Sequence, residues 1–314
     1  MKTQSIGISK LKTTRLAYGC MRIVGTWDPK SIGPDQRAMA SKAVHAAVDA
    51  GYTLFDHADI YCAGGCESVF GEILRASKGL RKKMVIATKC GIRFAGDPRA
   101  ESPHRYDFSA EHILASCDQS LKRLGIDTID LYQLHRPDVL MDPHEIAAAF
   151  AKLKKQGKVR EFGVSNFLPA KLAALQHACP VPLVVNQVEI HLGRLACFTD
   201  GTLDQCLEYH ITPLAWSPLG GGFLGTGGTV EGKGAWQDGM RKLLKLMDEM
   251  ARRHDVSRTV LALAWLLKHP SGIVPIVGSA NPARIKDAVK ADTLELSRED
   301  WYKLYVAARM EGLP

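Results

Sequence analysis

The stretch from residue 128 to 165, "TIDLYQLHRPDVLMDPHEIAAAFAKLKKQGKVREFGVS", contains the pattern on which the fold prediction rests. Its two ends, residues 128–134 and 159–165, are short, mainly apolar runs typical of buried strands. Residues 143–156 between them predict a helix that stops at Gly157. A strand, a helix and a second strand in this order predict two parallel strands whose sheet is covered by the helix.

The same unit recurs along almost the whole chain. The predicted strands are residues 15–20, 52–56, 84–89, 128–134, 159–165, 183–189, 212–217 and 273–278. The predicted helices are residues 36–50, 67–76, 109–124, 143–156, 169–177, 202–209, 238–254, 257–269, 282–291 and 298–310. Eight strands, each followed by a helix, predict a closed (β/α)8 barrel, the TIM barrel of the α/β class.

Three further features complete the fold prediction. β-like runs at 4–9 and 15–18 predict a short N-terminal β-hairpin. Extra helices are expected after strand seven and at the C-terminus. No linker or shift in composition divides the chain, so a single domain over residues 1–314 is predicted.

A doubly wound sheet that binds a dinucleotide is the main alternative fold. It requires G-x-G-x-x-G after the first strand, whereas residues 19–28 are "GCMRIVGTWD". Residues 227–234, "GGTVEGKG", are similar to a phosphate-binding P-loop, but Gly234 stands where Ser or Thr is required. A glycine-rich mobile loop after strand seven is therefore favoured.

The composition excludes several classes of protein. Hydrophobic residues make up 46% of the chain and charged residues 24%, which is typical of a globular protein. The net charge of +8 is spread along the chain, which fits a cofactor that carries phosphate and does not predict a nucleic-acid partner. The 8 cysteines form no paired framework, and neither a signal peptide nor a membrane-spanning run is present. A cytoplasmic monomer or weak homo-oligomer without a membrane partner is expected.

Titratable side chains stand at the ends of three predicted strands. The stretch "FDHADIYC", residues 55–62, supplies Asp56 and Tyr61, while Lys89 ends the third strand and His135 follows the fourth. Taken singly, each residue is better explained as a structural ion pair, edge aromatic or turn cap. In a barrel, however, the carboxyl ends of the strands meet at one rim, so the four together predict a catalytic site. His57 receives no role, because strand alternation points its side chain away from that of Asp56.

The chemistry of these four groups is mutually consistent. A phenol is a weak acid, with an ordinary pKa of about 10. A neighbouring Lys89 would lower the pKa of Tyr61, and Asp56 would hold Lys89 charged. His135 could hydrogen-bond a substrate oxygen and orient it. This set suits protonation of a carbonyl oxygen while a hydride arrives from a cofactor.

The chain resembles the aldo-keto reductase family in seven segments that follow the family order. They are "FDHADIY" (55–61), "ATK" (87–89), "DLYQLHRPD" (130–138), "GVSN" (163–166), "NQVE" (186–189), "WSPLGGGFL" (216–224) and "VGSANPARI" (277–285). The resemblance implies an NAD(P)H-dependent oxidoreductase that reduces aldehydes and ketones to alcohols. It also implies that Tyr61 is the general acid, with Lys89, Asp56 and His135 in support.

The resemblance further implies NADPH as the cofactor. Ser165, Asn166 and Gln187 match residues that hold the nicotinamide amide, and Trp216 matches an aromatic residue that stacks on it. The phosphate groups are matched by two sets: Ser217, Leu219 and Gly222 for the pyrophosphate, and Gly278, Ser279 and Arg284 for the 2′-phosphate. Many members have Lys where this chain has Gly278, which leaves the strength of the preference for NADPH open.

The substrate is expected to be a small or aromatic carbonyl compound. The candidate walls of its pocket are Trp27, Phe94, Tyr106 and Phe223. No metal is expected, because Cys62 and Cys66 have no second Cys or His pair at ligand spacing. The alternative function is that of a cofactor-binding regulatory protein, which some members of the family are. The intact set around Tyr61 favours an enzyme.

Overall fold

Eight parallel strands form a closed barrel in the computed structural model, which describes residues 1–313; Pro314, the last residue of the predicted domain, lies outside it. Around the barrel the strands are β3 (Ala17–Gly19), β4 (Leu54–Asp56), β5 (Val85–Cys90), β8 (Ile129–Leu134), β9 (Val159–Ser165), β10 (Leu183–Glu189), β11 (Thr212–Trp216) and β12 (Val274–Val277). β12 pairs in parallel with β3, and this pairing closes the ring. The predicted TIM barrel is confirmed.

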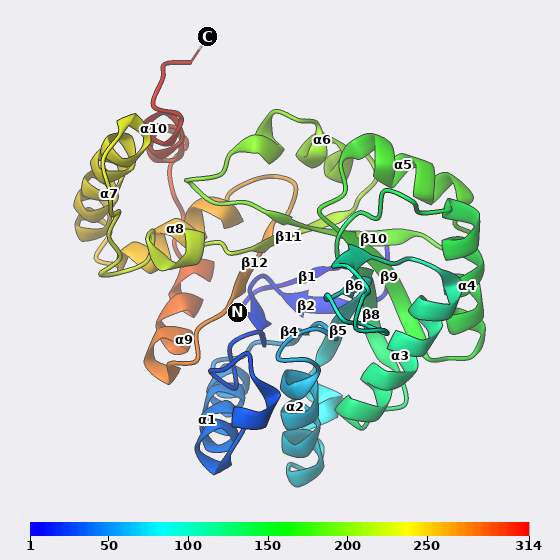
Figure 1. The fold of residues 1–314 in the computed structure, drawn as a ribbon. Helices are drawn as coiled ribbons and strands as arrows, with labels where there is room; N and C mark the ends of the chain where they lie inside the picture. The colour runs from blue at the N-terminus through cyan, green and yellow to red at the C-terminus, as the bar shows by residue number, and fades with distance from the viewer. Residues whose placement is uncertain (314) are drawn as a thin grey trace.

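Helices surround the barrel (Figure 1). They are α1 (Pro34–Asp49), α2 (Gly65–Ala76), α3 (Ala110–Leu124), α4 (Pro143–Lys155), α5 (Pro169–Ala178), α6 (Thr202–Glu208), α7 (Ala235–Arg253), α8 (Arg258–Leu267), α9 (Pro282–Ala288) and α10 (Arg298–Arg309). Short 3-10 turns are η1 (Pro29–Ser31), η2 (Leu80–Lys83), η3 (Ala196–Phe198), η4 (Gly220–Gly222) and η5 (Val289–Asp292). The predicted extra helices after strand seven and at the C-terminus, α7 and α10, pack together outside the ring.

Local sequence signals account for where the helices begin and end. Ser109 caps α3 by accepting a hydrogen bond from the backbone N–H of His112, and Asp142 caps α4 in the same way from His144. α3 ends at Gly125, which has a φ of 65° that favours glycine. Among residues 1–313, no helix is both long enough and apolar enough to cross a membrane.

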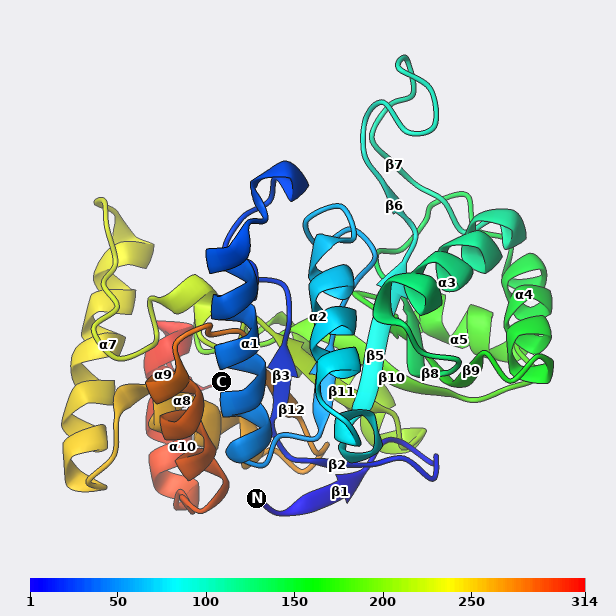
Figure 2. The same ribbon diagram turned by 90° about the horizontal axis from the view of Figure 1, so that it is seen from below.

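One end of the barrel is closed by the N-terminal hairpin of β1 (Thr3–Ser5) and β2 (Lys12–Thr14). Ile6 and Leu11, in the loop of this hairpin, pack against side chains that fill the barrel interior, among them Leu54, Leu131 and Leu214. The backbone N–H of Gly7 also bonds the hydroxyl of Thr212, at the start of β11. The hairpin therefore covers the amino ends of the strands, and Figure 2 shows it opposite the carboxyl ends.

Two details of the predicted fold are wrong. β1 pairs with β2 and not with residues 15–18, because the segment that follows β2 enters the barrel as β3, and both edges of β3 are taken by β4 and β12. The helix predicted for residues 282–291 ends as α9 at Ala288 and continues as the 3-10 turn η5.

A second hairpin was not predicted. It pairs β6 (Ile92–Arg93) with β7 (Arg105–Tyr106) and projects beyond the carboxyl ends of the barrel strands (Figure 2). Strands of two residues are too short to produce a readable alternation of polar and apolar side chains.

Candidate active site

Lys89 and Asp56 form a buried ion pair at the carboxyl ends of β5 and β4. The Lys89 Nζ atom donates to Asp56 Oδ1 at 2.8 Å and Oδ2 at 2.7 Å, and to the backbone carbonyl of His57 at 2.6 Å. Burial alone would lower the pKa of Lys89, but Asp56 and Tyr61 outweigh it and the pKa lies above its ordinary value. The ammonium group is therefore charged and has a partner for each of its three donors.

Tyr61 lies beside this pair. The Lys89 Nζ atom is 5.2 Å from the centroid of the Tyr61 ring, and the ring is 8% exposed. Burial raises the pKa of Tyr61 to about 12, although the charge of Lys89 acts in the opposite direction. Lys89 thus acts to lower the pKa of Tyr61, as predicted, but burial raises that pKa by more. The phenol keeps its proton at neutral pH and has one to donate.

His135 lies against Tyr61 from the end of β8. The two rings are 5.9 Å apart between centroids at an angle of 80°. Burial, together with the charges of Lys89 and Arg136, holds the pKa of His135 well below its ordinary value. The imidazole is therefore neutral and has one N–H donor, and its buried Nδ1 atom has no partner among residues 1–313.

Backbone contacts beyond the strand ends hold these side chains in register. The backbone N–H of His57 donates to the carbonyl of Ala87 at 2.8 Å, and that of Asp59 to the carbonyl of Lys89 at 3.0 Å. The backbone N–H of His135 donates to the carbonyl of Cys90 at 2.9 Å, so the pairing between barrel strands continues into the loops. The chain then turns from Tyr61 into α2 through Cys62, Ala63 and Gly64, with φ of 50°, 48° and 86°. Each non-glycine residue in this left-handed region costs about 1–3 kcal/mol, a strain that clusters at functional sites.

A polar network at the ends of β9, β10 and β11 adjoins the ion pair. The amide of Gln187 donates to Asp56 Oδ1 at 2.9 Å, which links the two groups directly. Ser165 donates to the carbonyl of Gln187 at 2.8 Å, and the Asn166 amide donates to Ser165 Oγ at 2.7 Å. The indole N–H of Trp216 donates to Asn166 Oδ1 at 2.9 Å. The structure therefore brings together all four residues predicted for the nicotinamide end.

The residues predicted for the cofactor phosphates lie farther along the same rim. Ser217 has a φ of 47°, and Leu219 precedes three left-handed glycines, Gly220 to Gly222, with φ of 56°, 68° and 115°. Gly278 is exposed at the end of β12, and the carbonyl of Ser279 accepts a hydrogen bond of 3.0 Å from the Tyr18 hydroxyl.

Arg284 is exposed in the first turn of α9. The backbone N–H groups of Ala283 and Arg284 are occupied, because both donate to Asn281 Oδ1. The guanidinium of Arg284 makes no ion pair or hydrogen bond within residues 1–313. It is free to contact an anion.

The four aromatic residues predicted to wall the substrate pocket do not form one group. Trp27 is 6.4 Å from Tyr61 between ring centroids and is 58% exposed. Phe223 is half-buried and packs against His191 and Trp236.

Phe94 and Tyr106 lie on the projecting hairpin. There they pack on His104 at 6.0 and 6.1 Å and are 46% and 37% exposed. Of the four aromatic residues, Trp27 is the one that the structure places in contact with Tyr61.

Two residues at the rim were not predicted. The guanidinium of Arg136 lies 5.1 Å from the ring centroid of Trp216, and Gln133 Oε1 accepts a bond of 3.4 Å from Gln187. The position of Arg136 directly after His135 could have identified it. His57 behaves as predicted: its ring is buried against Phe70 at 4.4 Å, and burial lowers its pKa to about 3.

No group of three or more possible metal ligands occurs among the described residues. All 8 cysteines are free thiols, including Cys62 and Cys66. Since a zinc site requires several ligands that converge, the structure offers none in residues 1–313.

Comparison with known proteins identifies the family. Residues 15–307 match the model of the Aldo/keto reductase family. The chain is 40% identical to the 6-dehydroglucose reductase of Novosphingobium aromaticivorans, over 99% of this chain and 97% of the relative. It is 39% identical to the oxidoreductase YdhF of Escherichia coli, over 93% of this chain and 94% of the relative.

The solved structures agree on the fold. A glycerol dehydrogenase from Gluconobacter oxydans superposes with a TM-score of 0.87 at 23% identity, over 98% of this chain and 95% of that structure. A thermostable aldo-keto reductase, Tm1743, superposes with a TM-score of 0.82 at 24% identity, over 98% and 100% of the two chains. With its barrel and its family match over nearly the whole length, this chain belongs to the aldo/keto reductase family of oxidoreductases.

Proposed function

We propose that this enzyme reduces small aldehydes and ketones to alcohols with NADPH, and that Tyr61 supplies the proton. The observation that carries the proposal is the environment of Tyr61. Its phenol is protonated at neutral pH, lies beside a paired ammonium group and contacts a neutral imidazole. All these groups stand at the end of the barrel that the N-terminal hairpin does not cover.

The roles of the residues follow from their charges. A reduced nicotinamide cofactor supplies the hydride when it is bound. The O–H bond of Tyr61 breaks as its proton passes to the carbonyl oxygen, which becomes the alcohol hydroxyl. Lys89 stabilises the phenolate that remains, and Asp56 holds Lys89 in place. The N–H of neutral His135 can hydrogen-bond the substrate oxygen and orient it before the transfer.

The residues at the rim fit a nicotinamide nucleotide in chemistry. Ser165, Asn166 and Gln187 offer hydroxyl and amide groups that match a carboxamide, and they are already ordered by mutual hydrogen bonds. The half-buried indole of Trp216 offers a flat apolar surface beside them. The turn at Gly220–Gly222 presents backbone without side chains, as close approach to a phosphate requires.

Arg284→Ala is expected to weaken NADPH binding by about 10- to 150-fold, because a charge-assisted contact to the 2′-phosphate is lost. NADH has no such phosphate and should lose little. Titration of both cofactors by quenching of Trp fluorescence measures the two dissociation constants. Lys286→Ala, which removes an exposed cation from the same helix, is the control. Equal losses for NADH and NADPH would mean that Arg284 does not bind the phosphate.

Gly278→Lys is expected to strengthen NADPH binding by about 2- to 10-fold without changing the affinity for NADH. Gly278 is exposed and a Cβ atom there would meet no atom within 4 Å, so the first atom of a side chain causes no clash. The added ammonium would face the same phosphate as Arg284. Gly278→Gln, of similar length but uncharged, separates charge from size. A gain in the Gln variant equal to that in the Lys variant would exclude an electrostatic cause.

The substrate class is best approached through sugar-type aldehydes. Two relatives, from Novosphingobium aromaticivorans and Agrobacterium fabrum, are named 6-dehydroglucose reductase, at 40% and 39% identity. A panel of sugar, aliphatic and aromatic carbonyl compounds, followed by loss of the absorbance of NADPH, tests the proposal. Consumption of NADPH with at least one class supports it. Tight NADPH binding without turnover of any of them would favour a regulatory protein instead.

A further inference from the structure

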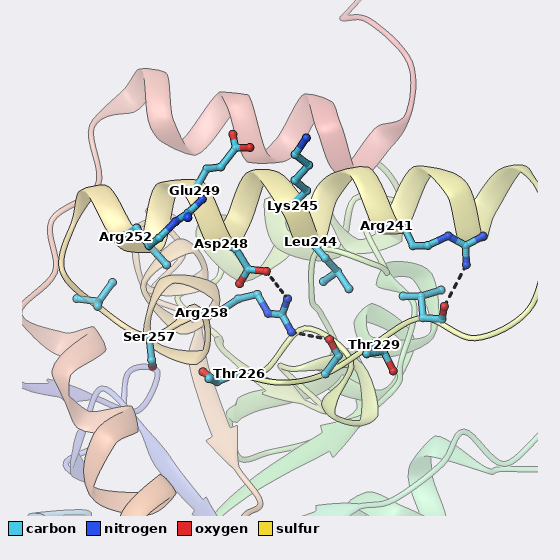
Figure 3. Close-up of a pocket in the computed structure, with 14 residues that line it drawn as sticks. Thr226, Thr229, Arg241, Leu244, Lys245, Asp248, Glu249, Arg252, Ser257 and Arg258 are labelled. Carbon is cyan, nitrogen blue, oxygen red and sulfur yellow. Dashed lines mark hydrogen bonds and ion pairs between the residues drawn. The ribbon is translucent and has the colours of Figure 1, made fainter.

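The loop after β11 is attached to the rest of the protein by a buried arginine. Arg258, the first residue of α8, is 6% exposed. Its Nε and Nη2 atoms donate to the carbonyl of Gly225 at 3.0 and 2.6 Å, and Nη2 also donates to Gly228 at 2.6 Å. Its Nη1 atom pairs with Asp248 of α7 at 3.0 Å (Figure 3). One side chain thus bonds two carbonyls of the loop.

The location of Arg258 is electrostatically unfavourable for the helix that carries it. The N-terminus of a helix has a positive partial charge, so acidic residues are preferred there. The first turn of α8 has no acidic residue and instead begins with this buried cation. Burying a guanidinium is costly unless its N–H groups are bonded. The bonds to the loop and the ion pair with Asp248 offset that cost, so Arg258 links the loop to α7 and α8.

The loop also has apolar contacts on either side of this point: Leu224 is fully buried in the core, and Val230 packs against that core. A groove of about 810 Å³ lies between α7 and the segment that includes Thr226, Gly228 and Val230 (Figure 3). Gly225 and Gly228 have no side chain to bury, so polar contacts hold this part of the loop. A further attachment nearby is Thr226, whose N–H donates to the hydroxyl of Thr259 at 3.0 Å.

Backbone packing connects the attached part of the loop to the glycine turn. The N–H of Gly225 donates to the carbonyl of Gly222 at 3.0 Å. A Cβ atom on Gly228 would lie 2.3 Å from that same carbonyl oxygen and 2.5 Å from the carbonyl oxygen of Phe223, so these backbones are in direct contact. A shift of Gly225 or Gly228 would thus move Gly222 and Phe223.

The turn itself consists of three glycines. Gly220, Gly221 and Gly222 are consecutive and all left-handed, and glycine has the greatest conformational freedom in the chain. The turn lies between a fixed strand end at Trp216 and the part of the loop bonded to Arg258. Its position therefore depends on the contacts that follow it, which are the buried side chain of Leu224 and the bonds of Arg258 to Gly225 and Gly228.

We propose that Arg258 is a positioning residue that keeps the glycine turn against the bound cofactor and thereby sets the rate at which the cofactor dissociates. This inference rests on the proposed function, in which Leu219 and Gly222 border the pyrophosphate. Arg258 itself touches neither the cofactor nor the substrate. It acts through the carbonyls of Gly225 and Gly228.

The test is the rate of NADPH release, measured by stopped-flow fluorescence after mixing the complex with excess NADP+. Arg258→Met is expected to accelerate release by about 10-fold or more, because two charge-assisted bonds to the loop are lost. Arg258→Lys keeps the charge but cannot bond both carbonyls from one planar group, so an intermediate acceleration is expected. The KM for NADPH should rise, while the single-turnover rate of reduction at saturating NADPH should not change.

Arg241→Met is the matched control. Arg241 also donates to loop carbonyls, those of Val230 and Gly232, but it is an exposed residue of α7 and contacts the loop beyond the attached part. Its loss should change the release rate by less than about twofold. If Arg241→Met and Arg258→Met accelerate release equally, the specific role of Arg258 is wrong.

Two further outcomes overturn the inference. One is wild-type release from a folded Arg258→Met, whatever the change in its melting temperature. If that variant does not fold, Arg258→Lys is measured in its place, and wild-type release from the folded Arg258→Lys protein is the second. A wild-type protein that binds no nicotinamide nucleotide would instead refute the proposed function, so the two failures are distinguishable.

Discussion

Tyr61→Phe should lower kcat for carbonyl reduction by about 10²- to 10⁴-fold, the range expected when a positioned acid is removed. The phenol hydroxyl is the one group lost, and it is needed in the transition state rather than for binding. The dissociation constant for NADPH should therefore stay close to that of the wild type. Steady-state kinetics and a fluorescence titration on the same preparation measure both quantities.

The matched control is Tyr209→Phe, which makes the same chemical change at a ring that is 54% exposed. Its kcat should equal that of the wild type. Near-normal turnover by Tyr61→Phe would end the assignment of Tyr61 as the acid. A large loss of NADPH binding in Tyr61→Phe would mean that the phenol supports the cofactor site instead.

Lys89→Met should lower both activity and stability. Lys89 fills the space between Asp56 and Tyr61 and is fully buried, so its removal leaves the Asp56 carboxylate without its cation. Breaking a buried ion pair in this way costs about 3–5 kcal/mol of unfolding free energy. The positive charge that counteracts the raised pKa of Tyr61 also disappears, so the phenol becomes a still weaker acid. A fall in kcat of about 10²-fold or more is expected.

The double variant Lys89→Met with Asp56→Asn separates the two effects. It removes the uncompensated charge together with the cation, so part of the lost stability should return. Its kcat should remain as low as that of Lys89→Met, because no cation is restored beside Tyr61. Recovery of activity along with stability would show that Lys89 acts only through the fold. Chemical denaturation and kcat measured on all three proteins decide between these outcomes.

The barrel and its rim are readable from the sequence because they depend on patterns that repeat. Apolar runs alternate with helical spacing, and the barrel then fixes where the strand ends meet. Asp56, Lys89 and His135 can therefore be grouped from the sequence alone, and the structure places them in contact with Tyr61 or with one another. The sequence does not show how strongly each neighbour shifts a pKa. For Tyr61, burial has a larger effect on the pKa than the charge of Lys89.

Features that depend on backbone or on loop direction could not be predicted. Arg258 bonds carbonyl groups of glycines, which leave no side-chain signature in the sequence. The hairpin that carries Phe94 and Tyr106 has strands of two residues, so neither its existence nor its direction followed from the pattern. Trp27 and Phe94 are equivalent in the sequence as aromatic loop residues, and the direction of each loop decides which of them reaches Tyr61.

The measurement that tests the proposed reaction most directly is the fate of deuterium from NADPH labelled at both C4 hydrogens. A carbonyl compound consumed in the panel assay is incubated with the labelled cofactor, and the alcohol is examined by mass spectrometry. One deuterium on the carbinol carbon is the expected result for the wild type, with little or no labelled alcohol from Tyr61→Phe. An alcohol without deuterium, or equal labelling by the two proteins, would contradict hydride transfer assisted by Tyr61.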